Sequence, residues 1–183
     1  MKSTLFVSLV LIICSCKKYD DNKKFSVYSV NERLIKKGAW QIVSIEDLTS
    51  NQKKEMQSSF LLNFKDDKFE IIDISTLSPY TIGGTDNYSD FIKPSIQGLM
   101  QDPSYILHFS ANDYESNYSL SDDKNKILLT DFITGYETTF NTYWKERYSL
   151  EFEIKRLEFG YMTLVYDNKL KINFKKIATE NKK

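Results

Sequence analysis

The sequence predicts an all-β protein, a single antiparallel up-and-down β-barrel or strongly curved sheet of about 8–10 strands. Two observations support this fold class. The 183 residues include 12 Phe and 12 Tyr but only 6 Gly and 3 Pro, a mixture that favours strands over helices. Apolar and polar residues also alternate along several segments with the period of two that is typical of half-buried strands.

The clearest alternation lies in the C-terminal third of the chain. In RYSLEFEIK, Tyr148 and Phe152 share one face with two aliphatic residues, and polar residues occupy the other face. KLKINFK repeats the pattern, with Phe174 on the apolar face. Between them, YMTLVY leads into Asp167-Asn168, residue types that tolerate the positive φ of a tight hairpin. This third is therefore predicted to be a meander of long antiparallel strands.

Upstream segments supply the remaining strands. FLLNFK and FEIIDI flank a short polar turn and predict another hairpin, with Phe64 on its apolar face. GAWQIVSIED, YILHF and TTFNTYW complete the predicted strands. Two segments have helical character: 31–37, a short turn that ends at Gly38, and 51–58, a possible second turn.

One long segment interrupts the strand pattern. Residues 75–104 hold all three prolines and three of the six glycines. Loops of this length are commonly functional or disordered, but this one also carries many apolar side chains. We expect a covering segment packed over the barrel, with a ligand lid as the alternative.

The N-terminal sequence has the features of a signal peptide that is removed by cleavage. The apolar run Leu5–Ile13 is much shorter than the roughly 20 residues of a membrane-spanning helix, and Lys2 precedes it as in a secretory signal. Ile13-Cys14-Ser15-Cys16 resembles the bacterial lipobox. That resemblance implies that Cys14 is discarded and that Cys16 becomes the acylated first residue. The predicted divisions are a signal peptide at 1–15, a lipidated flexible tether at 16–29, a barrel domain at 30–177 and a disordered tail at 178–183.

Charge and the residue after the cysteine bear on location. Removal of residues 1–15 takes away Lys2 and no acid, so 24 basic side chains face 25 acidic ones. No basic field is left to attract nucleic acid. Lipoproteins that stay in the inner membrane typically have Asp directly after the acylated cysteine, and this chain has Lys17 there. The resemblance therefore implies an outer-membrane location, on the periplasmic face or at the cell surface.

The sequence shows none of the common catalytic or metal-binding motifs. His108 is the single histidine, and no cysteine remains in the predicted domain after processing. There is no phosphate-cradling glycine loop, nucleophile elbow or His-Glu-x-x-His motif. Paired aspartates fall in the tether or in predicted turns, where Asp serves turn geometry. We therefore expect no enzyme activity, no cofactor and no metal.

Three segments resemble a known family. KKGAWQIVSIED is similar to the Gly-x-Trp strand that begins lipocalins, and FLLNFKDDKFEI and MTLVYDNKLKINFKK resemble hairpins of lipocalin-like bacterial lipoproteins. The resemblance covers about residues 30–177 and implies a calycin-type barrel whose base is closed by Trp40. The arginine that stacks on this Trp in lipocalins has no obvious counterpart, and Arg147 and Arg156 are the candidates.

These features predict a membrane-anchored envelope lipoprotein that binds a small apolar ligand or an envelope protein partner. A barrel of about eight strands either fills with side chains or holds one small ligand. The ligand-binding candidates are Trp40, Phe64, Tyr148, Phe152 and Phe174. The alternative is a filled barrel that acts as a non-enzymatic module of an outer-membrane assembly or as an immunity-type protein.

Overall fold

The computed structural model describes residues 19, 21–22, 28–36, 38–55, 60–73, 105–109, 116–137 and 145–178. Its elements are the helix α2 (Val30–Ile35) and the strands β1 (Ala39–Asp47), β2 (Gln52–Glu55), β3 (Phe60–Lys65), β4 (Lys68–Asp73), β5 (Tyr105–Phe109), β6 (Ser116–Leu120), β7 (Lys126–Glu137), β8 (Lys145–Leu157), β9 (Tyr161–Tyr166) and β10 (Leu170–Ile177). Within these residues, no helix is long and apolar enough to cross a membrane.

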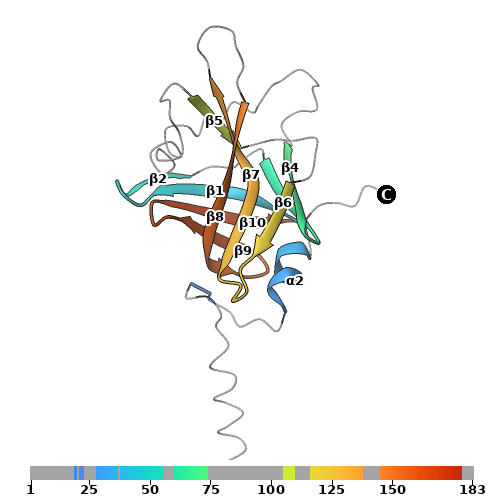
Figure 1. Ribbon diagram of the computed structural model, residues 1–183. Coiled ribbons are helices and arrows are strands. Elements are labelled where there is room, and N and C mark those ends of the chain that lie inside the picture. Colours follow the sequence, from blue (N-terminus) through green and yellow to red (C-terminus); the bar gives the residue numbers. More distant parts are fainter. Residues whose placement is uncertain are drawn as a thin grey trace, which may run out of the picture.

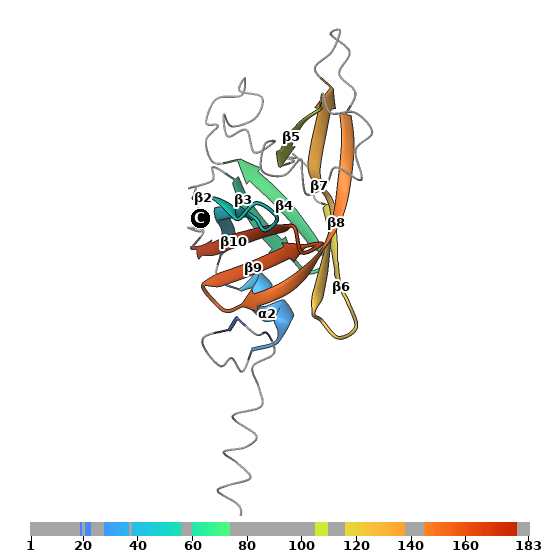
Figure 2. The same ribbon diagram turned by 90° about the vertical axis from the view of Figure 1, so that its left-hand side faces the viewer.

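Eight of the described strands close into an antiparallel barrel (Figures 1 and 2). Each barrel strand pairs with the next along the chain, in the order β1-β3-β4-β6-β7-β8-β9-β10. The ring closes because β10 pairs with β1 over most of its length, from Ala39 opposite Ile177 to Asp47 opposite Leu170. Two further strands lie beside the ring, β2 on β1 and β5 on β7. The predicted fold class is confirmed.

The alternation read from the sequence sets which side chains enter the barrel. Along β8, Leu150, Phe152 and Ile154 are buried, whereas Ser149 and Glu151 are exposed. The β9–β10 hairpin turns at the predicted pair of residues, which have φ values of 47° and 52°, as a tight hairpin turn requires. The prediction of a helical turn at 51–58 is wrong, because Gln52–Glu55 is strand β2, paired with the second half of β1. Tertiary pairing overrides the local preference there.

Helix α2 and a glycine fix the start of the barrel. Ser29 and Glu32 form a capping box at the helix N-terminus, each bonding the other's backbone N–H. The chain then passes Gly38, whose φ is +117°. A Cβ at this position would lie 2.0 Å from the carbonyl oxygen of Ile177, so only glycine lets the start of β1 lie this close to the end of β10.

The two ends of the barrel are built differently. The α2 end comprises α2, the β3–β4, β6–β7 and β8–β9 turns and the start of β1; the far end comprises the β1–β2 and β9–β10 turns with β2 and β5. The β3–β4 hairpin pairs with β1 and with β6 over two residues each, near the α2 end. Beyond those residues, β1 pairs with β2 and β7 pairs with β5. In Figure 1, β7 and β8 also extend past the other strands at the far end.

Several sequence predictions fall outside the described residues. They are the signal peptide at 1–15, the acylated Cys16, the covering segment at 75–104, the TTFNTYW strand and all but the first residue of the tail at 178–183. Part of the predicted tether is described, however, and it is packed against the barrel. Tyr19 is 3% exposed and Asn22 is 4% exposed.

Candidate functional site in the barrel interior

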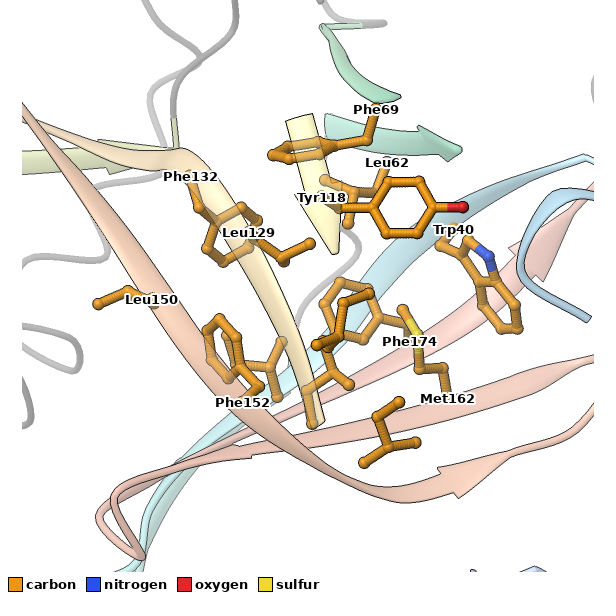
Figure 3. Close-up of a cluster of buried hydrophobic side chains, with 14 of the residues drawn as sticks. Trp40, Leu62, Phe69, Tyr118, Leu129, Phe132, Leu150, Phe152, Met162 and Phe174 are labelled. Carbon is orange, nitrogen blue, oxygen red and sulfur yellow. The ribbon is translucent and has the colours of Figure 1, made fainter. Parts of the chain in front are cut away.

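All five candidate binding residues belong to one buried hydrophobic cluster inside the barrel. Figure 3 shows three of them, Trp40, Phe152 and Phe174. Trp40 and Phe152 are fully buried, Phe64 and Phe174 are 1% exposed, and Tyr148 is 8% exposed. They come from β1, β3, β8 and β10, so the period of two brings residues distant in sequence onto a common face. Whether they contact a ligand stays a prediction.

Aromatic rings contact one another across the interior. Phe64 lies edge-to-face with Tyr118, with ring centroids 5.0 Å apart. The rings of Phe64 and Phe69 are tilted relative to each other, with centroids 6.0 Å apart. The contacts continue from Phe69 through Phe132 to Phe152, at 6.4 Å and 5.6 Å. Phe152 then meets Tyr166 at 5.9 Å. Because each ring contacts the next, these residues form a continuous aromatic band. Edge-to-face pairs stabilise a core beyond the area that they bury.

A β-bulge places Phe132 in this band. The register between β7 and β8 shifts between Leu129 and Ile133, and within the bulge Asp131 has φ +55°. The Asp131 amide donates to the hydroxyl of Ser149 at 3.2 Å. Since the extra residues reverse the alternation, Phe132 turns inward and is fully buried. Sequence alternation alone missed Phe132; its one local signal is an aspartate that tolerates positive φ.

Trp40 and Lys176 plug the α2 end. The indole Nε1–H of Trp40 donates to the carbonyl oxygen of Leu34 at 3.0 Å, which ties β1 to α2. The Lys176 ammonium lies 4.3 Å from the indole centroid. It also donates to the carbonyl oxygens of Arg33, Leu34 and Lys36, at 2.6, 3.2 and 2.5 Å. One lysine thus caps the C-terminal end of α2 and stacks on Trp40.

The cation on Trp40 is therefore a lysine, and not the arginine predicted at Arg147 or Arg156. Arg156 instead lies over the ring of Tyr161, 4.5 Å from its centroid, and pairs with Glu158. Lys176 is two residues after inward-facing Phe174 and directly opposite Trp40. The two-residue alternation along β10 places Lys176 on the same face as Phe174, so the sequence pattern could have identified Lys176 as the cation. Burial lowers the pKa of Lys176 to about 8.

The five candidates divide between the two ends. Trp40 and Phe64 belong to the α2 end, where Trp40 packs under α2 and Phe64 precedes the β3–β4 turn. Tyr148, opposite Ile133 on β7, lies toward the far end. Phe152 and Phe174 lie between them, and Phe174 pairs with Met162. An interior lined by hydrocarbon and aromatic side chains can hold apolar groups and excludes charged ones.

Titratable groups of the described residues lie mainly outside the barrel interior. His108 lies on β5, with its backbone opposite Thr134 of β7. Among the described residues, no group of three or more His, Cys, Asp or Glu side chains could hold a metal ion. Two hollows lined by described residues, of about 310 and 360 Å³, lie outside the barrel at the β6–β7 turn. Their linings mix aspartate, lysine and amide side chains.

Comparisons with known proteins add one structural likeness. No protein-family model matches the sequence, and no curated protein matches it. Among solved structures, a lipocalin-like protein from Bacteroides uniformis ATCC 8492 is similar at 17% identity and a TM-score of 0.43, with 79% of this chain and 99% of that chain covered. A likeness of this size carries no argument about function. The strand pairings of the chain itself establish the barrel.

Proposed function

We propose that this protein is a non-catalytic, membrane-anchored barrel that binds a small apolar ligand through the far-end half of its interior. The observation that carries the proposal is the difference between the two ends. The α2 end is plugged by Trp40, Lys176 and the helix. Among the described residues, the β3–β4 hairpin pairs with β1 and β6 only near the α2 end, and toward the far end the described wall is formed by β2 on β1 and β5 on β7. Entry from that side is the simplest route to the interior.

The chemistry of the interior supports an apolar occupant. Every member of the buried cluster is hydrophobic, and a series of ring contacts runs through it from Tyr118 to Tyr166. Tyr148, 8% exposed and toward the far end, combines an apolar ring with a hydroxyl, the kind of side chain that can contact a ligand with one polar end. Ligand affinity would then come from removing apolar surface from water, at about 25 cal/mol per Å².

Titration with a fluorescent fatty acid tests ligand binding. We expect saturable binding to the purified barrel, weakened by Tyr148→Ala at the far end. Tyr161→Ala is the matched control, because Tyr161 is 46% exposed on the outside and its loss should leave binding unchanged. Native mass spectrometry of protein purified from its own host should show a retained small molecule. Equal binding by both variants would contradict the far-end site.

A filled barrel that acts as an interaction module is the second candidate. The observation that favours it is the unbroken series of ring contacts across the interior. The two candidates give opposite results in the same experiments: a filled barrel retains no small molecule and binds no fatty acid.

We also propose that a lipid on Cys16 anchors the protein in the outer membrane. The support is the lipobox resemblance and the charge pattern that follows it. Mass spectrometry of the membrane fraction should identify an acylated peptide that begins at Cys16. Cys16→Ser should release the protein from the membrane, whereas Cys14→Ser should leave it attached. A soluble mature chain that begins elsewhere would contradict the anchor.

A further inference from the structure

We infer that the barrel rests on the lipid surface through its α2 end, with the far end turned away from the membrane. The contact surface, called here the aromatic rim, consists of Tyr28, Phe159 and Tyr161 with the cations Lys36 and Arg156. This inference rests on the proposed anchor at Cys16, and it is independent of ligand binding.

The first step is that the chain just after Cys16 is fixed to the α2 end. The hydroxyl of Tyr19 donates to the carbonyl oxygen of Lys124 in the β6–β7 turn at 2.7 Å. The backbone N–H of Asp21 donates to Lys155 at 3.1 Å. The side-chain oxygen of Asn22 accepts from the buried N–H of Leu157 at 2.9 Å. Figures 1 and 2 both show the short segment of residues 21–22 at the same end as α2.

Arg33 strengthens this attachment. It is 5% exposed and donates from Nη1 to the carbonyl oxygen of Leu157 at 2.7 Å. Its guanidinium also lies 5.7 Å from the centroid of the Tyr19 ring. One buried cation therefore joins α2, the end of β8 and the N-terminal segment. Burial of the Tyr19 ring also raises the pKa of its hydroxyl to about 12, so Tyr19 stays neutral and bonded at physiological pH.

The second step is covalent reach. Cys16 is three residues before Tyr19, and three residues of extended chain span at most about 11 Å. Acyl chains on Cys16 must enter the bilayer, so Tyr19 cannot lie farther than that from the lipid headgroups. Since Tyr19 is fixed to the α2 end, that end must also face the membrane. A flexible tether of the predicted length, 16–29, would have imposed no such orientation.

The third step is the composition of the aromatic rim. Among the described residues, the large hydrophobic side chains classed as exposed are Tyr28, at 40%, and Tyr161, at 46%. Tyr28 lies edge-to-face with Phe159, with centroids 4.5 Å apart. Lys36 lies 5.2 Å from the Tyr28 ring, and Arg156 covers Tyr161. Tyrosine rings beside lysine and arginine are typical of the membrane–water interface.

Exposed aromatic rings, rather than net charge, distinguish one side of the α2 end. In the β3–β4 and β6–β7 turns, the exposed aspartates Asp66, Asp67, Asp122 and Asp123 stand beside the exposed lysines Lys65, Lys68 and Lys124. In the aromatic rim, Lys36 pairs with Glu32 and Arg156 pairs with Glu158. The exposed rings of Tyr28 and Tyr161 therefore favour contact through α2 and the β8–β9 turn. The rim alone is small, so it orients the barrel while the lipid supplies the affinity.

Lysine acetylation followed by mass spectrometry tests the orientation on the lipidated protein. Lys36 at the α2 end and Lys53 and Lys169 at the far end have closely matched side-chain exposures of 50%, 47% and 46%. On vesicles of phosphatidylethanolamine and phosphatidylglycerol, we expect Lys36 to be acetylated at least about threefold more slowly than in detergent. The two far-end lysines should react at the same rate in both. Equal protection at both ends, or protection at the far end alone, would overturn the inference.

Two further samples separate orientation from the anchor itself. If the native chain lacks lipid, a lipid maleimide coupled to Cys16, the single thiol of residues 16–183, still attaches the barrel to vesicles and allows the same measurement. The double variant Tyr19→Ala, Asn22→Ala keeps the anchor but releases the segment, so protection of Lys36 should fall toward its value in detergent. Unchanged protection in the double variant would show that the docked segment does not set the orientation.

Discussion

The α2 end and the far end of the barrel are held by different kinds of contact. At the α2 end, the polar side-chain groups of Trp40, Lys176 and Arg33 each bond a backbone carbonyl of α2 or β8. Toward the far end, among the described residues, β1 pairs with β2 rather than β3, and the end of β7 pairs with β5 whereas its start pairs with β6. From this difference we expect the α2 end, called here the base, to be more rigid than the far end. Stability is unevenly distributed in proteins, and binding regions come from its lower range.

Replacing Trp40 by alanine should give the largest effect at the base. The change removes a fully buried ring and its hydrogen bond to Leu34, and we expect the free energy of unfolding to fall by about 3–5 kcal/mol. Tyr148→Ala at the far end should cost less, because Tyr148 retains some exposure. Urea denaturation followed by circular dichroism measures both. A larger loss of unfolding free energy for Tyr148→Ala than for Trp40→Ala would contradict the expectation that the base is the more stable end.

Gly38→Ala should also destabilise the base. The residue has φ +117°, and a Cβ would meet the Ile177 carbonyl oxygen at 2.0 Å. The start of β1 must then move away from the end of β10, which we expect to cost at least about 2 kcal/mol. Gly160→Ala is the control, because nothing lies within 4 Å of its Cβ, and its effect should stay within about 0.5 kcal/mol. Thermal unfolding of the two variants side by side gives the comparison.

A smaller change, Asn22→Ala, tests how firmly the N-terminal segment is joined to the base. It leaves the Leu157 N–H without the side-chain oxygen that it bonds at 2.9 Å, and we expect a loss of about 1 kcal/mol. Hydrogen exchange of the Leu157 amide should accelerate correspondingly. Asn117→Ala, on an exposed position of β6, should leave that amide unchanged. An unaltered exchange rate in Asn22→Ala would mean that the segment is not held by this bond.

The barrel itself could be predicted because its strands obey local rules. Alternation identified β8 and β10, and a pair of turn-forming residues identified the β9–β10 hairpin. The same rule placed Tyr148, Phe152 and Phe174 on the inner face. These features depend on the period of the strand and on turn chemistry, which short stretches of sequence contain.

The remaining features depend on contacts between distant residues. Gln52–Glu55 looks like a polar turn and becomes a strand because β1 offers it an edge. Phe132 turns inward through a bulge that alternation does not reveal. Tyr19 and Asn22 look like part of a solvated tether, but their partners, Lys124 and Leu157, are more than 100 positions away. No local pattern contains information of that range.

The smallest effect concerns the charge of Lys176 at the base. Burial lowers its pKa from 10.5 to about 8 in the folded protein. Between these values, the unfolded chain holds more protons at this position than the folded chain does. The contribution of Lys176 to stability must therefore increase as pH rises from about 8 toward 10.5, and it is least favourable below pH 8. Because the side chain retains contact with water, we expect an increase of about 1 kcal/mol rather than the full linkage value.

Lys176→Met isolates this contribution, because methionine keeps an apolar stem beside Trp40 but cannot titrate. Denaturation of both proteins at pH 7, 8, 9 and 9.5 should show the wild type gaining stability relative to the variant as pH rises. Other lysines and tyrosines titrate equally in the two proteins, so their effects cancel in the difference. A difference that shrinks with rising pH would mean that the folded state prefers the charged amine. The three carbonyl oxygens and the indole face would then outweigh burial, and the base would be held chiefly by that charge.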